Sequence, residues 1–226
     1  GAFKYFGSTL QSAVKQTESE ELLIPQPVQE MLDYLLEHGL ETEGIFRIPG
    51  SADEVSQLRA HYNGEGGKGI HKGTDVHAVA GLLKLYLREL PDPLLTFKFY
   101  EPFIFVQRNK EFDDGTKYMH FKNLLNALPE ENVALVRALI EFLHRVAEHH
   151  ETNKMTLSNL AIVFGPELLR PADDSMLKLL QEAGCVNAVV RKILEQYGFF
   201  LKGEELREIP RESKRATMVI TQGANA

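Results

Sequence analysis

The feature that most constrains the fold of this 226-residue chain is an apolar repeat of about 3.6 residues. The repeat is clearest over residues 75–90, where the apolar side chains fall on one side of a helix: Val76, Val79, Leu83, Tyr86, Leu87 and Leu90. An alternating strand pattern is absent from the sequence, and the extended-looking residues 46–49 are too few to start a sheet. The sequence therefore predicts an all-α fold.

Helix boundaries follow from proline, glycine and capping residues. We expect a single-domain bundle of eight or nine helices, with clear signals at 27–38, from 51 onward, 75–90, 96–108, 115–128, 129–149, 157–163 and 174–197. Pro91 and Pro93 end the helix of 75–90, and Gly165-Pro166 is expected to end the helix of 157–163. We expect a flanking segment at 1–5, the domain at 6–202 and a flexible polar tail at 203–226.

Composition excludes several classes of protein. The formal net charge of -7 disfavours a general nucleic-acid binder, which needs a basic surface. A single cysteine rules out an intrachain disulfide, and a reducing, cytoplasmic compartment fits that better than secretion. No apolar run approaches the ~20 residues of a membrane span, and no signal peptide is visible. The chain does not begin with Met, so we interpret it as a piece of something longer.

Motifs for a self-contained active site are missing. The glycine-rich stretch 64–69 lacks the spacing and the hydroxyl residue of a phosphate-binding loop, so it is interpreted as a flexible connection. His149 and His150 are adjacent, which points them about 100° apart on a helix and prevents a joint metal face. Cys185 is interpreted as a packing residue, since no motif ties a His or Asp to it. The chain is therefore expected to act on another protein.

One candidate residue lies in the connection between the first two helices. Arg47 follows Ile45 and Phe46 and precedes Ile48, so apolar anchors flank a single cation. Gly44 and the Pro49-Gly50 pair set the turns of this segment. Arg47 is either a projecting cation on an anchored loop or a surface arginine in a local ion pair.

Two helices carry the other candidates. Lys84 and Arg88 are four residues apart and share a helix face with the small residue Gly81, so another chain could approach closely there. That face could equally be solvated. Asn159 is a polar position in an otherwise apolar helix, and its amide either contacts a partner or satisfies neighbouring backbone.

Taken together, these segments resemble the RhoGAP domain family, whose members activate Rho-type small GTPases. The resemblance spans about 6–201 in the family's order and spacing. It is carried by Phe6-Gly7, Gly44-Ile45-Phe46-Arg47, residues 82–95 (LLKLYLRELPDPLL), Asn153-Lys154-Met155, residues 159–166 (NLAIVFGP) and Asn187-Ala188-Val189-Val190. Several independent blocks make a chance match implausible.

The resemblance implies a role for each candidate residue. Arg47 would be an arginine finger, inserted in trans into the active site of the GTPase. Arg88 would brace the finger loop, while Lys84, Asn159 and Asn187 would contact the switch regions of the partner. The chain would have no cofactor and no reaction of its own, because GTP and Mg²⁺ are held by the partner.

The implied partners are GTP-bound Rho- and Rac-type GTPases, with neither nucleic acid nor membrane as a partner of this segment. The chain would be a cytoplasmic monomer, recruited to membranes by flanking domains. Two alternatives stay open from the sequence: a RhoGAP-like module that binds these GTPases without activating them, and a helical scaffold that does not contact them.

Overall fold

The computed structural model describes residues 3–17, 23–64, 66–173 and 175–202. Within those ranges every regular element is helical, which confirms the predicted all-α class. The helices are α1 (Leu10–Lys15), α2 (Gln26–His38), α3 (Ala52–Asn63), α4 (Val76–Glu89), α5 (Phe97–Arg108), α6 (Asp114–Asn126), α7 (Glu130–Glu148), α8 (His150–Asn153), α9 (Leu157–Leu168), α10 (Met176–Glu195) and α11 (Tyr197–Lys202).

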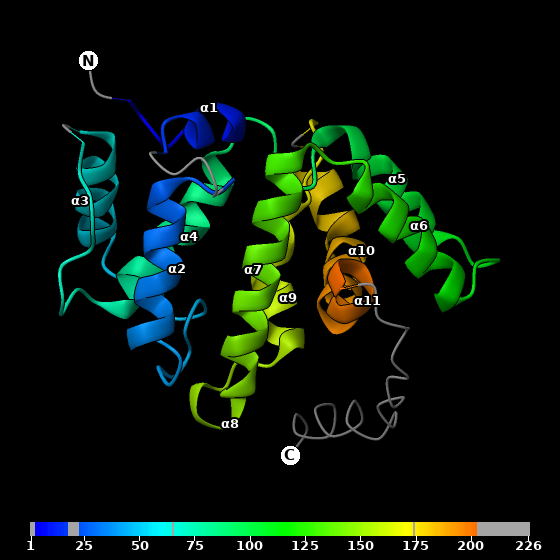
Figure 1. Cartoon of the computed structure of the whole chain (residues 1–226). Helices are drawn as coiled ribbons and strands as arrows, with labels where there is room; N and C mark the ends of the chain where they lie inside the picture. The colour runs from blue at the N-terminus through cyan, green and yellow to red at the C-terminus, as the bar shows by residue number, and fades with distance from the viewer. Residues whose placement is uncertain (1–2, 18–22, 65, 174, 203–226) are drawn as a thin grey trace.

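The long helix α7 lies at the centre of the molecule (Figure 1). It contacts α1 and α2 on one side and α9, α10 and α11 on the other. Helix α4 lies behind α2 and carries α3 at the outer edge of the molecule, while α5 and α6 extend the bundle beyond α10. Because α4 contacts α9 and α9 packs along α10, these three helices form a continuous layer.

The core is built from the apolar stripes that the sequence predicts. Helix α7 buries the inward residues of its repeat: Val136, Leu139, Ile140, Leu143 and Val146. Each fully buried side chain of this size contributes about 1.5–3 kcal/mol relative to an exposed one. Within the described residues, no helix has both the length and the apolar composition needed to cross a bilayer.

Helix α4 shows how local sequence fixes the elements. The side chain of Asp75 accepts a hydrogen bond from the backbone N–H of His77, which satisfies one of the unpaired donors at the helix start. Leu90, the residue before Pro91, has extended backbone angles, so the helix ends at the position that proline dictates. Lys84 and Arg88 are thereby held on a helix with both ends defined.

The predicted end of α9 is wrong. The helix does not break at Gly165-Pro166 but continues to Leu168. A proline removes one backbone hydrogen bond, but contacts beyond it hold the last turn in place. The backbone N–H of Leu169 donates to the carbonyl of Gly165 at 3.0 Å, and Leu95 donates to the carbonyl of Leu168 at 3.0 Å. The turn after the proline is thus fixed by tertiary structure.

The described residues form eleven helices where eight or nine were expected, and the short helices α1, α8 and α11 account for the difference. Each has six residues or fewer, so too few side chains repeat for a periodic pattern to be recognised. The flexible tail expected at 203–226 lies outside the described residues, as does the start of the expected 1–5 flanking segment.

Candidate functional site

Arg47 lies on the connector, residues 39–50, which joins α2 to α3. Ile45 and Phe46 are buried with exposed fractions of 0% and 1%, whereas Arg47 is exposed. The backbone N–H groups of Arg47 and Ile48 both donate to the carbonyl of Gly44 at 2.8 Å, closing a tight turn. Ile45 and Phe46 therefore anchor the segment as the sequence predicts, and Arg47 is exposed beside them. The anchoring role expected of Ile48 is wrong: its side chain is 47% exposed because the tight turn places it over Gly44, where an added Cβ would lie 2.5 Å from Cδ1 of Ile48.

Phe46 fixes the connector immediately before Arg47. Its ring lies edge-on to Phe142 of α7 and Phe164 of α9, with centroid separations of 5.8 and 4.9 Å. Its backbone has a φ of 70°, a left-handed conformation that is rare for a bulky residue and costs about 1–3 kcal/mol. The aromatic contacts hold this conformation, which sets the direction in which the next residue leaves the core.

Lys84 of α4 donates a hydrogen bond to the connector. Its Nζ donates to the carbonyl oxygen of Phe46 at 2.8 Å, so a charge-assisted hydrogen bond holds the peptide that leads into Arg47. Burial, which disfavours a charged amine, lowers the pKa of Lys84; the nearby carboxylate of Glu167 opposes this shift and the cation Arg88 adds to it. The structure thus gives Lys84 a bracing contact in addition to the partner contact that the resemblance implies for it.

Arg88 is bonded to α9 and not to the connector. Its Nη2 and Nε donate to the two carboxylate oxygens of Glu167 at 2.7 and 3.2 Å. This bidentate pairing raises the pKa of Arg88 above its ordinary value. The bracing contact expected of Arg88 is therefore made by Lys84, and Arg88 instead ties α4 to α9. Glu167 is not predicted from the sequence as a site residue. The sequence signal that could have identified it is a single carboxylate within an otherwise apolar run.

Asn159 lies in the first turn of α9. Its Nδ2 donates to the carbonyl of Lys154 at 3.2 Å, and its backbone N–H donates to Oγ1 of the capping residue Thr156 at 3.2 Å. One turn further along, Ile162 is 58% exposed. Helix α9 therefore presents one polar and one apolar side chain on its open face.

Asn187 of α10 lies against Gly165 of α9, a position without a side chain. A methyl group at Gly165 would lie 2.6 Å from Oδ1 of Asn187, so the amide occupies the space above this glycine. That oxygen is buried and has no hydrogen-bond partner among the described residues. An unpaired buried acceptor is costly, and this oxygen faces α9 and not the solvent.

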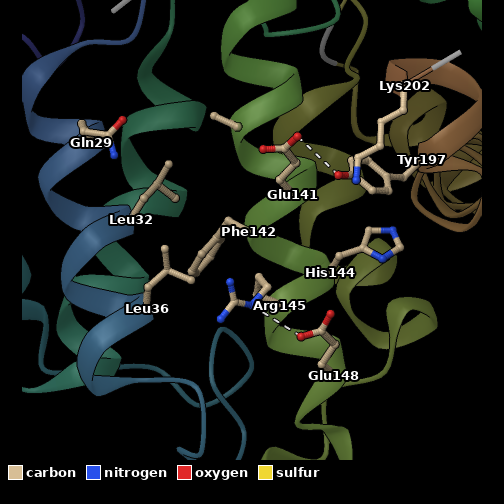
Figure 2. A pocket seen from close by; sticks show the side chains of 11 residues that line it. Gln29, Leu32, Leu36, Glu141, Phe142, His144, Arg145, Glu148, Tyr197 and Lys202 are labelled. Carbon is tan, nitrogen blue, oxygen red and sulfur yellow. Dashed lines mark hydrogen bonds and ion pairs between the residues drawn. The ribbon is translucent and has the colours of Figure 1, made fainter.

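A separate groove of about 700 Å³ lies between α2, α7 and α11 (Figure 2). Its floor includes Leu32 and Phe142, and its rim carries the Arg145–Glu148 ion pair at 3.4 Å. None of the five candidate residues lines this groove. The candidate site is thus a surface over α4, α9 and the connector, not an enclosed cavity.

Three of the candidate residues are cations. Arg47 belongs to the connector, Lys84 of α4 donates to the Phe46 carbonyl, and Arg88 of α4 is paired with Glu167 of α9. The connector also carries two exposed carboxylates, Glu41 and Glu43, so the surface around Arg47 presents charges of both signs.

Comparisons with known proteins identify the family. A family model described as the RhoGAP domain matches residues 25–173. Rho GTPase-activating protein gacJJ of Dictyostelium discoideum is 36% identical over 201 residues, covering 86% of this chain and 23% of that protein. Rho GTPase-activating protein 22 of Mus musculus is 34% identical over 204 residues, covering 90% of this chain and 29% of that protein.

A solved structure agrees with these matches. The crystal structure of human Rho GTPase activating protein 15 is similar with a TM-score of 0.78 and 27% sequence identity, covering 88% of this chain and 92% of that chain. The chain belongs to the RhoGAP domain family. It spans about a quarter of the length of the curated relatives described above.

Proposed function

We propose that this chain accelerates GTP hydrolysis by Rho-family small GTPases by inserting Arg47 into the active site of the partner. The observation that carries the proposal is the geometry of the connector, where an exposed arginine follows a fully buried, backbone-strained Phe46. Membership of the RhoGAP family and relatives named as Rho GTPase-activating proteins support the same function.

The chemistry follows from the charge that develops during phosphoryl transfer. Negative charge spreads over the γ-phosphoryl and leaving oxygens, while the GTPase itself holds GTP and Mg²⁺. A planar, permanently charged guanidinium neutralises that charge and donates several hydrogen bonds at once. Arginine fingers contribute ~10³–10⁵ in rate, which corresponds to roughly 4–7 kcal/mol of barrier. This chain contributes that group and has no reaction of its own.

The other candidates serve docking and support in this proposal. Lys84 holds the Phe46 carbonyl and so limits how far Arg47 moves. Arg88 keeps α4 and α9 in register through Glu167 while leaving 58% of its side chain exposed to a partner. Asn159 offers an amide to the switch regions, and the half-buried Asn187 contributes through the part of its side chain other than the buried oxygen. The partner is taken to be in the GTP-bound state and this chain to act as a monomer.

Single-turnover hydrolysis with a panel of GTP-loaded Rho- and Rac-type GTPases tests the proposal. Arg47→Ala should lower the stimulated rate by ~10³–10⁵ while binding to the GTP-bound partner survives. Arg47→Lys should recover little of that rate, since an ammonium cannot bridge two oxygens. Arg137→Ala is the matched control, because Arg137 is also exposed but lies on α7.

The outcomes separate the candidate functions. An Arg47→Ala variant as active as the parent would remove Arg47 from the mechanism. Tight binding by the parent without acceleration would favour a module that binds only. A complex with the GDP-bound partner that requires aluminium fluoride, which mimics the transferring phosphoryl group, would argue against a scaffold without GTPase contact.

A further inference from the structure

Asn153 is a fully buried residue that contacts the connector at two points. Its side-chain Nδ2 donates to the carbonyl oxygen of Leu40 at 2.8 Å. Its backbone carbonyl accepts from the N–H of Gly44 at 2.8 Å. These two contacts bracket the turn that directly precedes Ile45, Phe46 and Arg47. Asn153, which is far from the connector in sequence, therefore fixes the position at which the stretch from Ile45 to Arg47 begins.

The same side chain also fixes the start of α9. The second hydrogen of Nδ2 donates to the carbonyl of Val146 at the end of α7, at 2.7 Å. Its Oδ1 accepts from the N–H of Met155 at 2.8 Å, immediately before the residue that caps α9. Both amide hydrogens and the amide oxygen are thus used, and leaving any one of them unpaired in this buried place would be costly.

Asn153 thereby connects the two parts of the candidate site. The connector carries Arg47, and the first turn of α9 carries Asn159, whose amide donates to the carbonyl of Lys154. Loss of the Asn153 amide would remove the side-chain bonds to Leu40, Val146 and Met155 and so loosen the connector against the start of α9, without altering Arg47 or Asn159 themselves. Small displacements matter because a misplacement of ~1 Å at a reacting centre can cost about a hundredfold in rate.

We propose that Asn153 is a positioning residue, which holds the Arg47 connector and the Asn159 end of α9 in the register that GTPase activation requires. The proposal rests on the function proposed above. Asn153 does not touch the partner; it acts through Arg47. Its removal should therefore lower the maximal stimulated rate more than it lowers affinity for the GTPase.

The test compares Asn153→Ala with a matched control, Asn132→Ala. Asn132 is also a buried asparagine, 5% exposed, and its Nδ2 donates to a connecting-segment carbonyl, that of Leu94, at 2.9 Å. The segment that it holds does not carry the arginine. Both variants lose a buried amide, so both should melt at lower temperature, and rates are measured where each is folded by circular dichroism.

Asn153→Ala should lower the maximal single-turnover rate by about tenfold to a hundredfold, with the half-saturating concentration changed by less than about threefold. Asn132→Ala should leave the maximal rate within about twofold of the parent. On the Arg47→Ala background, Asn153→Ala should have little further effect, because groups that act as a unit are not additive. Equal rate losses in the two Asn variants, or an undiminished loss on the Arg47→Ala background, would overturn the proposal.

Two further measurements keep the inference independent of folding and of the proposed function. If Asn153→Ala does not fold, Asn153→Asp keeps the shape and the acceptor but places an oxygen opposite the carbonyls of Leu40 and Val146. Amide hydrogen exchange at Arg47 and Ile48 should be faster in the Asn153 variant than in Asn132→Ala, whether or not any GTPase is activated. Unchanged exchange would refute the positioning role, whereas a parent that stimulates no GTPase would refute only the proposed function.

Discussion

Replacing Gly50 by alanine places a methyl group against the backbone of α4. The added carbon would lie 2.5 Å from the amide nitrogen of Ala78, 2.6 Å from its Cα and 2.7 Å from the carbonyl carbon of His77. All three are backbone atoms, so no side chain can rotate away. Restoring an ordinary contact of 3.4 Å requires the connector and the first turn of α4 to separate by roughly 0.9 Å.

The expected cost follows from this overlap. Overpacking at rigid sites costs typically 1–3 kcal/mol, and for a domain of this size about 1 kcal/mol lowers the melting temperature by ~2–4 °C. Gly50→Ala should therefore melt about 2–12 °C below the parent. Gly184→Ala is the control, because no neighbouring atom lies within 4 Å of its added methyl and it is inside α10. Helix propensity alone should raise its stability by about 0.5–1 kcal/mol.

Thermal melting followed by circular dichroism, with urea denaturation as a second measure, distinguishes the two substitutions. The same chemical change should shift stability in opposite directions, since one glycine touches backbone and the other faces open space. If Gly50→Ala were as stable as the parent, the close approach of the connector to α4 would be refuted, and with it the argument that α4 fixes the position of Arg47.

Three other substitutions test separate parts of the structure. Thr156→Ala should lower stability by about 1 kcal/mol in urea denaturation, because it removes the oxygen that caps α9. Phe46→Ala should cost about 3–5 kcal/mol by the same method, and a smaller loss would mean that this ring is not a principal anchor. Burial and the hydrogen bond to Glu30 raise the pKa of Tyr62 above its ordinary 10.0, so the stability they provide is present below pH 10 and is lost as pH rises further. Tyr62→Phe should reduce this alkaline loss in unfolding measured from pH 9 to 11, and an unchanged slope would contradict the assignment.

The sequence was most informative where a pattern repeats over several turns. Helix α7 and the end of α4 at Pro91 were predicted because an apolar repeat and a helix-ending proline are both local features of the sequence. The burial of Ile45 and Phe46 before the exposed Arg47 was predicted for a similar reason, whereas Ile48 after it was expected to be an anchor and is 47% exposed. The continuation of α9 past Pro166 was missed because tertiary contacts outweighed the local preference of the proline.

Pairings between distant side chains could not be predicted. Arg88 and Glu167 are 79 residues apart, and Lys84 and the Phe46 carbonyl are 38 apart. The sequence places Lys84 and Arg88 on one helix face but does not say which of them reaches the connector and which reaches α9. Which of the two side chains reaches which target depends on how α4 packs against the connector and against α9. The connecting role of Asn153 was missed for the same reason, since its partners are backbone groups of three segments.

The strained backbone at Phe46 is held by several contacts within the chain, so the connector is ordered before any partner binds. Ordering one residue costs about 1–2 kcal/mol, so a connector that became ordered only on docking would weaken binding by several times that amount. Here the connector is ordered when the chain folds, because the contacts that hold it are all within the chain. They are the aromatic contacts of Phe46, the hydrogen bond from Lys84 and the hydrogen bonds of Asn153. In the proposed function, a partner would then have to fix the exposed side chain of Arg47 but not the backbone that carries it. Loosening any one restraint should therefore slow the stimulated reaction before it abolishes association.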